Sequence, residues 1–140
     1  MIYTSYFAML RNLPENVIPI SICGKAPEWY KGIQYKKLAP KYDFFMQYKE
    51  DGDESHYVKC YDERVTGILN ADQVVKEVYS LLSEPDKEKD VALICYEKPG
   101  DFCHRHLVAK WLNEHGYECT EWSKELLKEK SDQKEVELDI

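Results

Sequence analysis

Apolar residues gather in four short runs that predict β-strands. The run that ends at Cys95 has no polar alternation, which is typical of a central strand covered on both faces. Another run contains Pro19, which cannot donate a ladder hydrogen bond, so we expect that strand at an edge of the sheet or Pro19 near its start. The four runs cover residues 2–6, 17–22, 91–95 and 117–122.

Between these runs, apolar positions recur at helical spacing and predict four helices. The last helix begins at Asp101 or Phe102 and is followed by Gly116, a residue suited to a left-handed C-terminal cap. Asn70 or Asp72 is expected to cap the third helix. The helices are expected over residues 41–49, between 57 and 69, between 74 and 82, and from 101 or 102 to 115, with a long loop over 23–40.

The order of these elements predicts an α/β fold, namely a single three-layer domain with a short, mainly parallel sheet and helices on both faces. We place this domain over residues 1–122. Residues 123–140 are mostly charged, which predicts a frayed helix or a disordered tail. In parallel sheets ligands bind at the carboxyl ends of the strands. The loops that follow residues 22 and 95 are therefore expected to meet at one edge.

The amino-acid composition indicates which partners the protein can bind and in which cellular compartment it works. The chain has 140 residues and a formal net charge of −7, which opposes bulk binding to nucleic acid or anionic lipid because that binding rests on Lys and Arg. Specific contact with nucleic acid would need a local basic patch.

No apolar run approaches the roughly 20 residues that cross a bilayer. The five cysteines are odd in number and follow no secretory signal, which argues against a disulfide framework and predicts a reducing, cytoplasmic location.

Side chains capable of chemistry are concentrated in one stretch. At about 100° per residue, His104 lies on the apolar face of the last helix and points at the sheet, Cys103 and Arg105 flank that face, and His106 points to solvent. A cysteine in the first turn of a helix is a candidate for a lowered pKa, and an arginine there is a candidate ligand for phosphate or carboxylate. Each residue taken alone also fits an ordinary packing role. The stretch reads Cys95-Tyr96-Glu97-Lys98-Pro99-Gly100-Asp101-Phe102-Cys103-His104-Arg105-His106.

Most known motifs are absent from this stretch. Nine residues separate Cys95 from Arg105, too many for a Cys-x5-Arg phosphatase loop, and the zinc deaminase pattern, the Walker motif and Gly-x-Gly-x-x-Gly are all missing. A zinc site made of Cys95, Cys103 and His104 is chemically feasible, but it matches no standard ligand spacing. The sequence therefore predicts no bound zinc and no other cofactor.

The same stretch resembles the Cys-x-Glu and Cys-His-Arg signature of the bacterial, archaeal and phage family known as domain of unknown function 488. Weaker agreement extends over most of the chain and ends near Trp122. The resemblance implies an α/β fold and no particular reaction. Where many members carry an arginine near the end of the second strand, this chain has Lys25, to which an anion contact there would fall. The site residues that the resemblance marks are Cys95, Glu97, Cys103, His104 and Arg105.

Two functions of different classes remain. In the first, the protein is an enzyme that acts on a phosphate-bearing ligand, such as a nucleotide or a nucleic-acid component. Cys95 or Cys103 would be its nucleophile, His104 or Glu97 its general acid or base, and Arg105 its anion clamp.

In the second, the protein is a non-catalytic module that binds an anion or a nucleotide, and its cysteines only pack. Arg105, Lys25 and Tyr96 are the expected ligand contacts in either case. Tyr57, Tyr61 and Arg64 either line the same cleft or serve as ordinary residues of an amphipathic helix. The sequence carries no signal for the oligomeric state.

Overall fold

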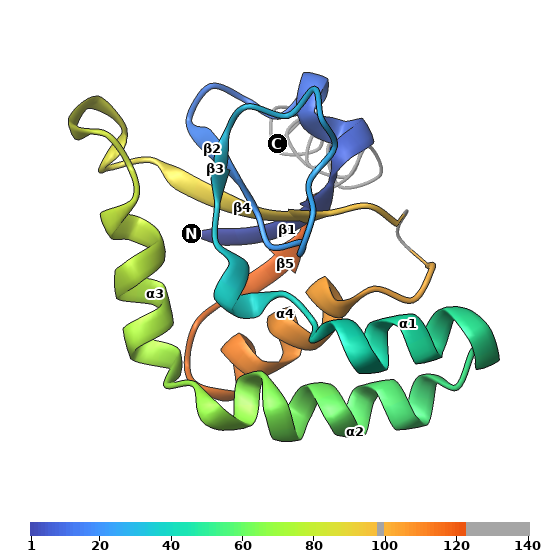
Figure 1. The fold of residues 1–140 in the computed structure, drawn as a ribbon. Helices are drawn as coiled ribbons and strands as arrows, with labels where there is room; N and C mark the ends of the chain where they lie inside the picture. Colours follow the sequence, from blue (N-terminus) through green and yellow to red (C-terminus); the bar gives the residue numbers. More distant parts are fainter. Residues whose placement is uncertain (98–99, 123–140) are drawn as a thin grey trace, which may run out of the picture.

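The structure is a computed structural model, and it describes residues 1–97 and 100–122. Its centre is a five-stranded sheet in the order β3-β2-β4-β1-β5, and all the pairings among the described strands are parallel (Figure 1). This confirms the predicted α/β class. The strands are β1 (Ile2–Tyr6), β2 (Val17–Ser21), β3 (Ile33–Gln34), β4 (Asp90–Cys95) and β5 (Cys119–Glu121).

Strand β4 lies in the middle of the sheet because its side chains are apolar on both faces. Val91 and Leu93 pack into the core cluster on one face, and Ala92 and Ile94 pack into the cluster on the other. This is the predicted behaviour of a strand without polar alternation. The strand pairs with β1 on one side and β2 on the other, so the carboxyl ends of all three strands meet at one edge.

The four α-helices all lie on one side of the sheet (Figure 1), and each of them contributes buried apolar residues to the same core cluster. Among the described residues, the opposite face is covered by the 3-10 helix Phe7–Asn12 and by the loop that reaches Tyr30. Helices therefore cover both faces, as predicted, although the α-helices are confined to one of them, because helical spacing identifies the apolar face of a helix but not the side of the sheet it covers. The α-helices are α1 (Tyr42–Asp51), α2 (Glu54–Arg64), α3 (Ala71–Ser80) and α4 (His104–Glu114), and the shorter 3-10 helices are Lys36–Leu38, Thr66–Ile68 and Glu84–Asp86.

Pro19 predicts either an edge strand or a position near the start of its strand. Strand β2 is not at the edge, and Pro19 is the third of its five residues. The two-residue strand β3, within the predicted 23–40 loop, pairs with Ile20 and Ser21 and so lies outside β2. The Pro19 carbonyl accepts a hydrogen bond from the Tyr30 hydroxyl at 3.2 Å. That carbonyl and the proline ring nitrogen lie on the side of β2 away from β4, so the ladder between β2 and β4 loses no hydrogen bond.

Two helix ends follow their local sequence signals. The Asn70 side chain accepts a hydrogen bond from the Gln73 N–H at 3.0 Å and caps α3. Gly116, with φ of 90°, follows the end of α4 as predicted. Within the described ranges, none of the helices has the length and apolar character needed to cross a membrane. The predicted tail over 123–140 lies outside the described residues.

Candidate active site at the carboxyl edge of the sheet

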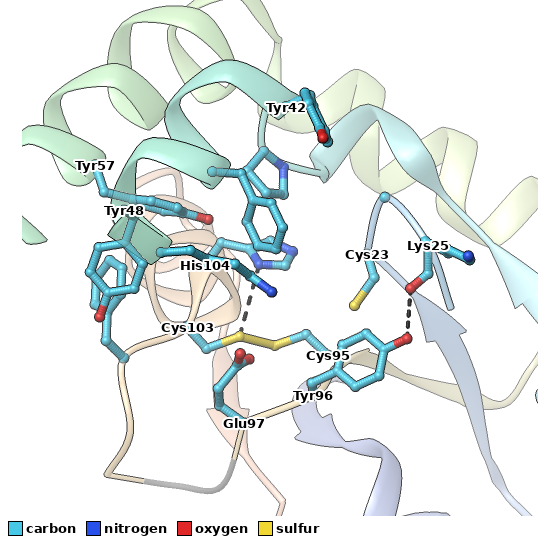
Figure 2. A pocket seen from close by; sticks show the side chains of 15 residues that line it. Cys23, Lys25, Tyr42, Tyr48, Tyr57, Cys95, Tyr96, Glu97, Cys103 and His104 are labelled. Carbon is cyan, nitrogen blue, oxygen red and sulfur yellow. Dashed lines mark hydrogen bonds between the residues drawn. A yellow bond between two sulfur atoms is a disulfide. The ribbon is translucent and has the colours of Figure 1, made fainter. Parts of the chain in front are cut away.

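A pocket of about 950 Å³ opens at the carboxyl edge of the sheet. It lies between the loops that follow β2 and β4, helices α1 and α2, and the start of α4 (Figure 2). The loops predicted to meet at this edge therefore do meet there. Three cysteines line the pocket, Cys23, Cys95 and Cys103, and its aromatic lining includes Tyr48, Tyr57 and Phe102.

Two of these cysteines are joined by a disulfide bond. Cys95 is the last residue of β4, and Cys103 is the residue just before α4. Both are almost fully buried and both contact the pocket. The expectation of reduced cysteines is wrong for this pair. Cys23, Cys60 and Cys119 are free, so the disulfide is a local feature of the site and not part of a framework.

His104 begins α4 and points its ring at the end of β2, as the helical spacing predicts. Its Nε2 lies 2.8 Å from the Ile22 carbonyl oxygen, and a carbonyl can only accept, so Nε2 carries the proton. The unprotonated Nδ1 then lies 3.8 Å from the Cys103 Sγ. Burial lowers the pKa of His104 to about 4, which keeps the ring neutral at pH 7.

The donor atoms of Cys95, Cys103 and His104 all lie within 4.8 Å of one another. The predicted convergence of these three side chains at the carboxyl edge is thus confirmed. The start of α4 differs from the prediction in one respect. Cys103 has an extended backbone, with φ of −155°, and is the N-cap residue of α4 and not part of its first turn.

Arg105 does not face the pocket, which corrects its predicted role as an anion ligand. Its side chain is completely buried. Nε and Nη2 each donate to a carboxylate oxygen of Glu121 at 3.0 Å. Nη1 donates to the Glu97 carbonyl at 2.6 Å and to the Cys95 Sγ at 3.2 Å. The guanidinium is therefore committed to β5, to the loop after β4 and to one sulfur.

Glu121 is the partner of Arg105 that sequence reasoning missed. It lies on β5, 16 residues after Arg105, and also accepts a hydrogen bond from the Thr4 hydroxyl at 2.7 Å. No local pattern connects Glu121 with Arg105, because their contact depends on β5 pairing beside β1.

The other predicted site residues lie around the mouth of the pocket. Glu97, Tyr96 and Lys25 are exposed, and all three line it. The Tyr96 hydroxyl donates to the Lys25 carbonyl at 2.7 Å and so joins the loops after β4 and β2 (Figure 2). His106 was predicted to point to solvent, but it is half-buried.

The aromatic wall of the pocket was largely missed from the sequence. The Tyr57 ring lies 4.9 Å from the Phe102 ring, and the Tyr48 ring lies 5.1 Å from it. Of the three residues considered for the cleft from the second helix, only Tyr57 lines it. Tyr61 is buried and donates to the Leu38 carbonyl, and Arg64 forms an exposed ion pair with Asp43.

Cys23 is a second feature that the sequence did not mark as part of the site. It lines the same pocket as the disulfide, and its Sγ lies 3.8 Å from the Ile94 carbonyl oxygen. Burial, together with the nearby Glu97 carboxylate, raises the pKa of the Cys23 thiol to about 12. Cys23 is thus held as a protonated thiol in the pocket that the Cys95–Cys103 pair also lines.

The fold and the site define a class of protein, an α/β domain with a cysteine–histidine site at the carboxyl edge of a parallel sheet. A family model described as "Active DUF488-N3 subclade" matches residues 6–116. The chain belongs to this DUF488 family, as the sequence resemblance implied. No curated protein and no solved structure matches the chain.

Proposed function

We propose that this protein is an enzyme whose reactive group is the Cys95/Cys103 pair in its reduced form, and that its substrate carries a phosphate. The observation that carries the proposal is that both sulfurs contact the same pocket and each has its own polar neighbour. The Arg105 Nη1 donates to the Cys95 Sγ at 3.2 Å, and the His104 Nδ1 lies 3.8 Å from the Cys103 Sγ. A matched family model described as active agrees with this proposal.

In the reduced protein, Cys95 is the better nucleophile because an adjacent guanidinium stabilises a thiolate. The thiolate would form a bond to the electrophilic atom of the substrate, and the bond from that atom to the leaving group would break. The His104 Nδ1, which carries no proton, would first accept the thiol proton as a general base and then return it to the leaving group; Glu97 at the pocket mouth is the other candidate for carrying this proton. Arg105 acts here as a positioning residue for the sulfur.

The lining of the pocket suits a ligand with an aromatic ring and a phosphate, such as a nucleotide or a nucleic-acid component. Tyr48, Tyr57 and Phe102 supply aromatic surface on which a base can pack. Lys25 and Lys49 line the pocket and are exposed, so they take over the anion contact first expected of Arg105. The phosphate would bind at the pocket mouth and the ring deeper inside.

The second candidate is a module that binds the same kind of ligand without catalysis. The bond between Cys95 and Cys103 favours it, because a disulfide would hold the loop after β4 against the start of α4. In that case the cysteines are structural and the pocket alone carries the function.

Thiol reactivity separates the two candidates. The protein is reduced with a phosphine, reacted with iodoacetamide over a range of pH, and mapped by mass spectrometry. If the protein is an enzyme, Cys95 should be alkylated well below pH 8.5, because an ordinary cysteine has a pKa of about 8.5. Cys23 is the internal control, because it lines the same pocket and should stay unmodified in the native protein. If Cys95 and Cys103 are as inert as Cys23, the enzyme proposal is wrong.

Ligand binding tests the substrate class. Inorganic phosphate and mononucleotides are titrated while the melting temperature is followed, because a ligand that binds the native state raises its stability. We expect Lys25→Gln and Lys49→Gln to weaken this effect, and Lys36→Gln to leave it unchanged, since Lys36 is exposed and lies outside the pocket lining. Equal stabilisation of all variants would contradict a phosphate site at the pocket mouth.

A further inference from the structure

We propose that the reduced site binds one zinc ion through Cys95, Cys103 and His104, with a fourth coordination position open to the pocket. The proposal concerns the residues of the proposed function but requires no catalysis by them. The sequence alone predicts no zinc here, because the three residues match no standard ligand spacing. The fold nevertheless brings their donor atoms close together. Two sulfurs and one imidazole nitrogen form a ligand set that selects zinc over magnesium or calcium.

The distances fit a tetrahedral ion. Zinc–sulfur bonds of about 2.3 Å and zinc–nitrogen bonds of about 2.0 Å place a sulfur and a nitrogen ligand about 3.5 Å apart, and two sulfurs about 3.8 Å apart. The Cys103 Sγ and the His104 Nδ1 are 3.8 Å apart, and the three donors lie within 4.8 Å of one another. The Cys95 and Cys103 Cα atoms are 7.4 Å apart, so the reduced sulfurs have room to separate and share an ion.

The surroundings of the donors also match a metal site. A histidine that binds a metal usually donates its other ring N–H to a carbonyl or carboxylate. The His104 Nε2 donates in this way to the Ile22 carbonyl, which fixes the ring and leaves Nδ1 as the ligand atom. The Arg105 Nη1 donates to the Cys95 Sγ and would stabilise a metal-bound thiolate. All three donor residues are buried, yet all three line the pocket.

The site can bind zinc only after the Cys95–Cys103 bond has been reduced. A phosphine or a dithiol gives two electrons, and with two protons the Cys95–Cys103 bond becomes two thiols. Zinc binding then displaces these two protons, and His104 binds as the neutral imidazole. Two thiolates compensate the charge of the ion. Three protein ligands and one open position form the arrangement typical of catalytic zinc sites, whereas structural sites have four protein ligands.

Zinc and the covalent route use the same electron pairs on sulfur. A zinc ion bound to Cys95 should therefore protect it from alkylation. This makes the two proposals separable. Rapid alkylation of Cys95 without any zinc binding would overturn the zinc site and leave the proposed function standing. Zinc binding by thiols that are inert without zinc would do the reverse.

The test uses the full chain, reduced with a phosphine, stripped with a chelator and dialysed against zinc. We expect one zinc per chain by elemental analysis. Cys103→Ser and His104→Ala should weaken binding by more than the roughly tenfold to 100-fold that loss of an outer partner costs. Cys23→Ser is the matched control, since Cys23 lines the same pocket but is not in the donor set, and it should retain the zinc.

Cobalt gives a readout that does not depend on the variants folding. The reduced wild-type protein with one equivalent of cobalt should show a thiolate-to-cobalt charge-transfer band and the visible bands of a tetrahedral ion. Absence of these bands, or of zinc in the dialysed wild-type protein, would overturn the proposal. Equal loss of zinc in Cys23→Ser and Cys103→Ser would overturn it as well, because the ion would then not be bound at this donor set.

Discussion

His104 and Arg105 are neighbours in the chain and both are buried, yet they lie in different environments beside the sulfur pair. His104 faces the pocket, with one nitrogen bound to the Ile22 carbonyl and the other directed at the Cys103 Sγ. Arg105 faces β5, and each of its three nitrogens donates to a protein atom. Two neighbouring residues of one short motif therefore have different roles. The residue that keeps an unprotonated nitrogen beside the pocket can serve chemistry, and the residue whose three nitrogens all donate to protein atoms holds the site together.

The largest expected effect is on stability, from replacing Arg105. Arg105→Met would leave the Glu121 carboxylate without its guanidinium and the Glu97 carbonyl without its donor. Removing one partner of a buried ion pair costs about 3–5 kcal/mol, and we expect the lower end because Glu121 is partly exposed. Urea unfolding measures the change.

Arg64→Met is the control for this substitution. Arg64 forms an ion pair with Asp43 of similar length, but on the surface, so its loss should leave the stability nearly unchanged. Arg105→Lys should also lower the free energy of unfolding, because an ammonium group cannot reproduce the paired contacts with Glu121. If Arg105→Lys keeps wild-type stability and loses phosphate binding, Arg105 is an anion clamp after all.

The next effect concerns His104 and pH. Burial, with smaller contributions from the Arg105 charge and His106, lowers the pKa of His104 to about 4 in the folded protein, against about 6.5 in the unfolded chain. Between these values the unfolded chain binds more protons, so stability falls as the pH drops from 6.5 towards 4. The loss from this residue is on the order of 3 kcal/mol.

Urea unfolding at pH 7 and pH 4, with a chelator present, measures this contribution by difference. The wild-type protein should lose more stability than His104→Gln, whereas His115→Gln, at an exposed position after α4, should behave like the wild-type protein. Equal losses in the wild-type protein and His104→Gln would show that the ring is not held neutral by burial.

The smallest effect is expected at the pocket mouth. Tyr96→Phe removes the hydrogen bond to the Lys25 carbonyl, which joins two exposed loops. The loss should be roughly 0.5 kcal/mol, at the low end for a single hydrogen bond, because water can replace the hydroxyl. Tyr42→Phe changes a more exposed ring of the same pocket and serves as the control. A large loss of stability in Tyr96→Phe would contradict this expectation and show that the fold depends on the contact between the two loops.

Much of the fold could be predicted from the sequence, because its signals are local. The apolar run of β4, the helical spacing of α3 and the left-handed cap at Gly116 each act over a few residues. The short strand β3 could not be predicted, since two residues carry no periodicity. The side of the sheet that each helix covers depends on the chain path and not on the helix itself.

The candidate site likewise has a part that local sequence predicts and a part that it does not. Cys95, Cys103 and His104 lie close together along the chain, and the end of a strand followed by the start of a helix predicts that they converge. The role of Arg105 depends on Glu121, and the aromatic wall brings Tyr48 together with Phe102 from distant elements. Such contacts are set by the packing of the whole domain, so no local spacing predicts them.

We propose that the reactive sulfurs lie in the pocket that binds a phosphate-bearing ligand. The most direct test is the rate at which iodoacetamide alkylates Cys95 in the reduced, metal-free protein, with and without a mononucleotide. We expect Cys95 to react rapidly and millimolar nucleotide to slow the reaction, while Cys23 stays unmodified in both cases. An inert Cys95, or a reactive Cys95 whose rate the nucleotide does not change, would contradict this proposal.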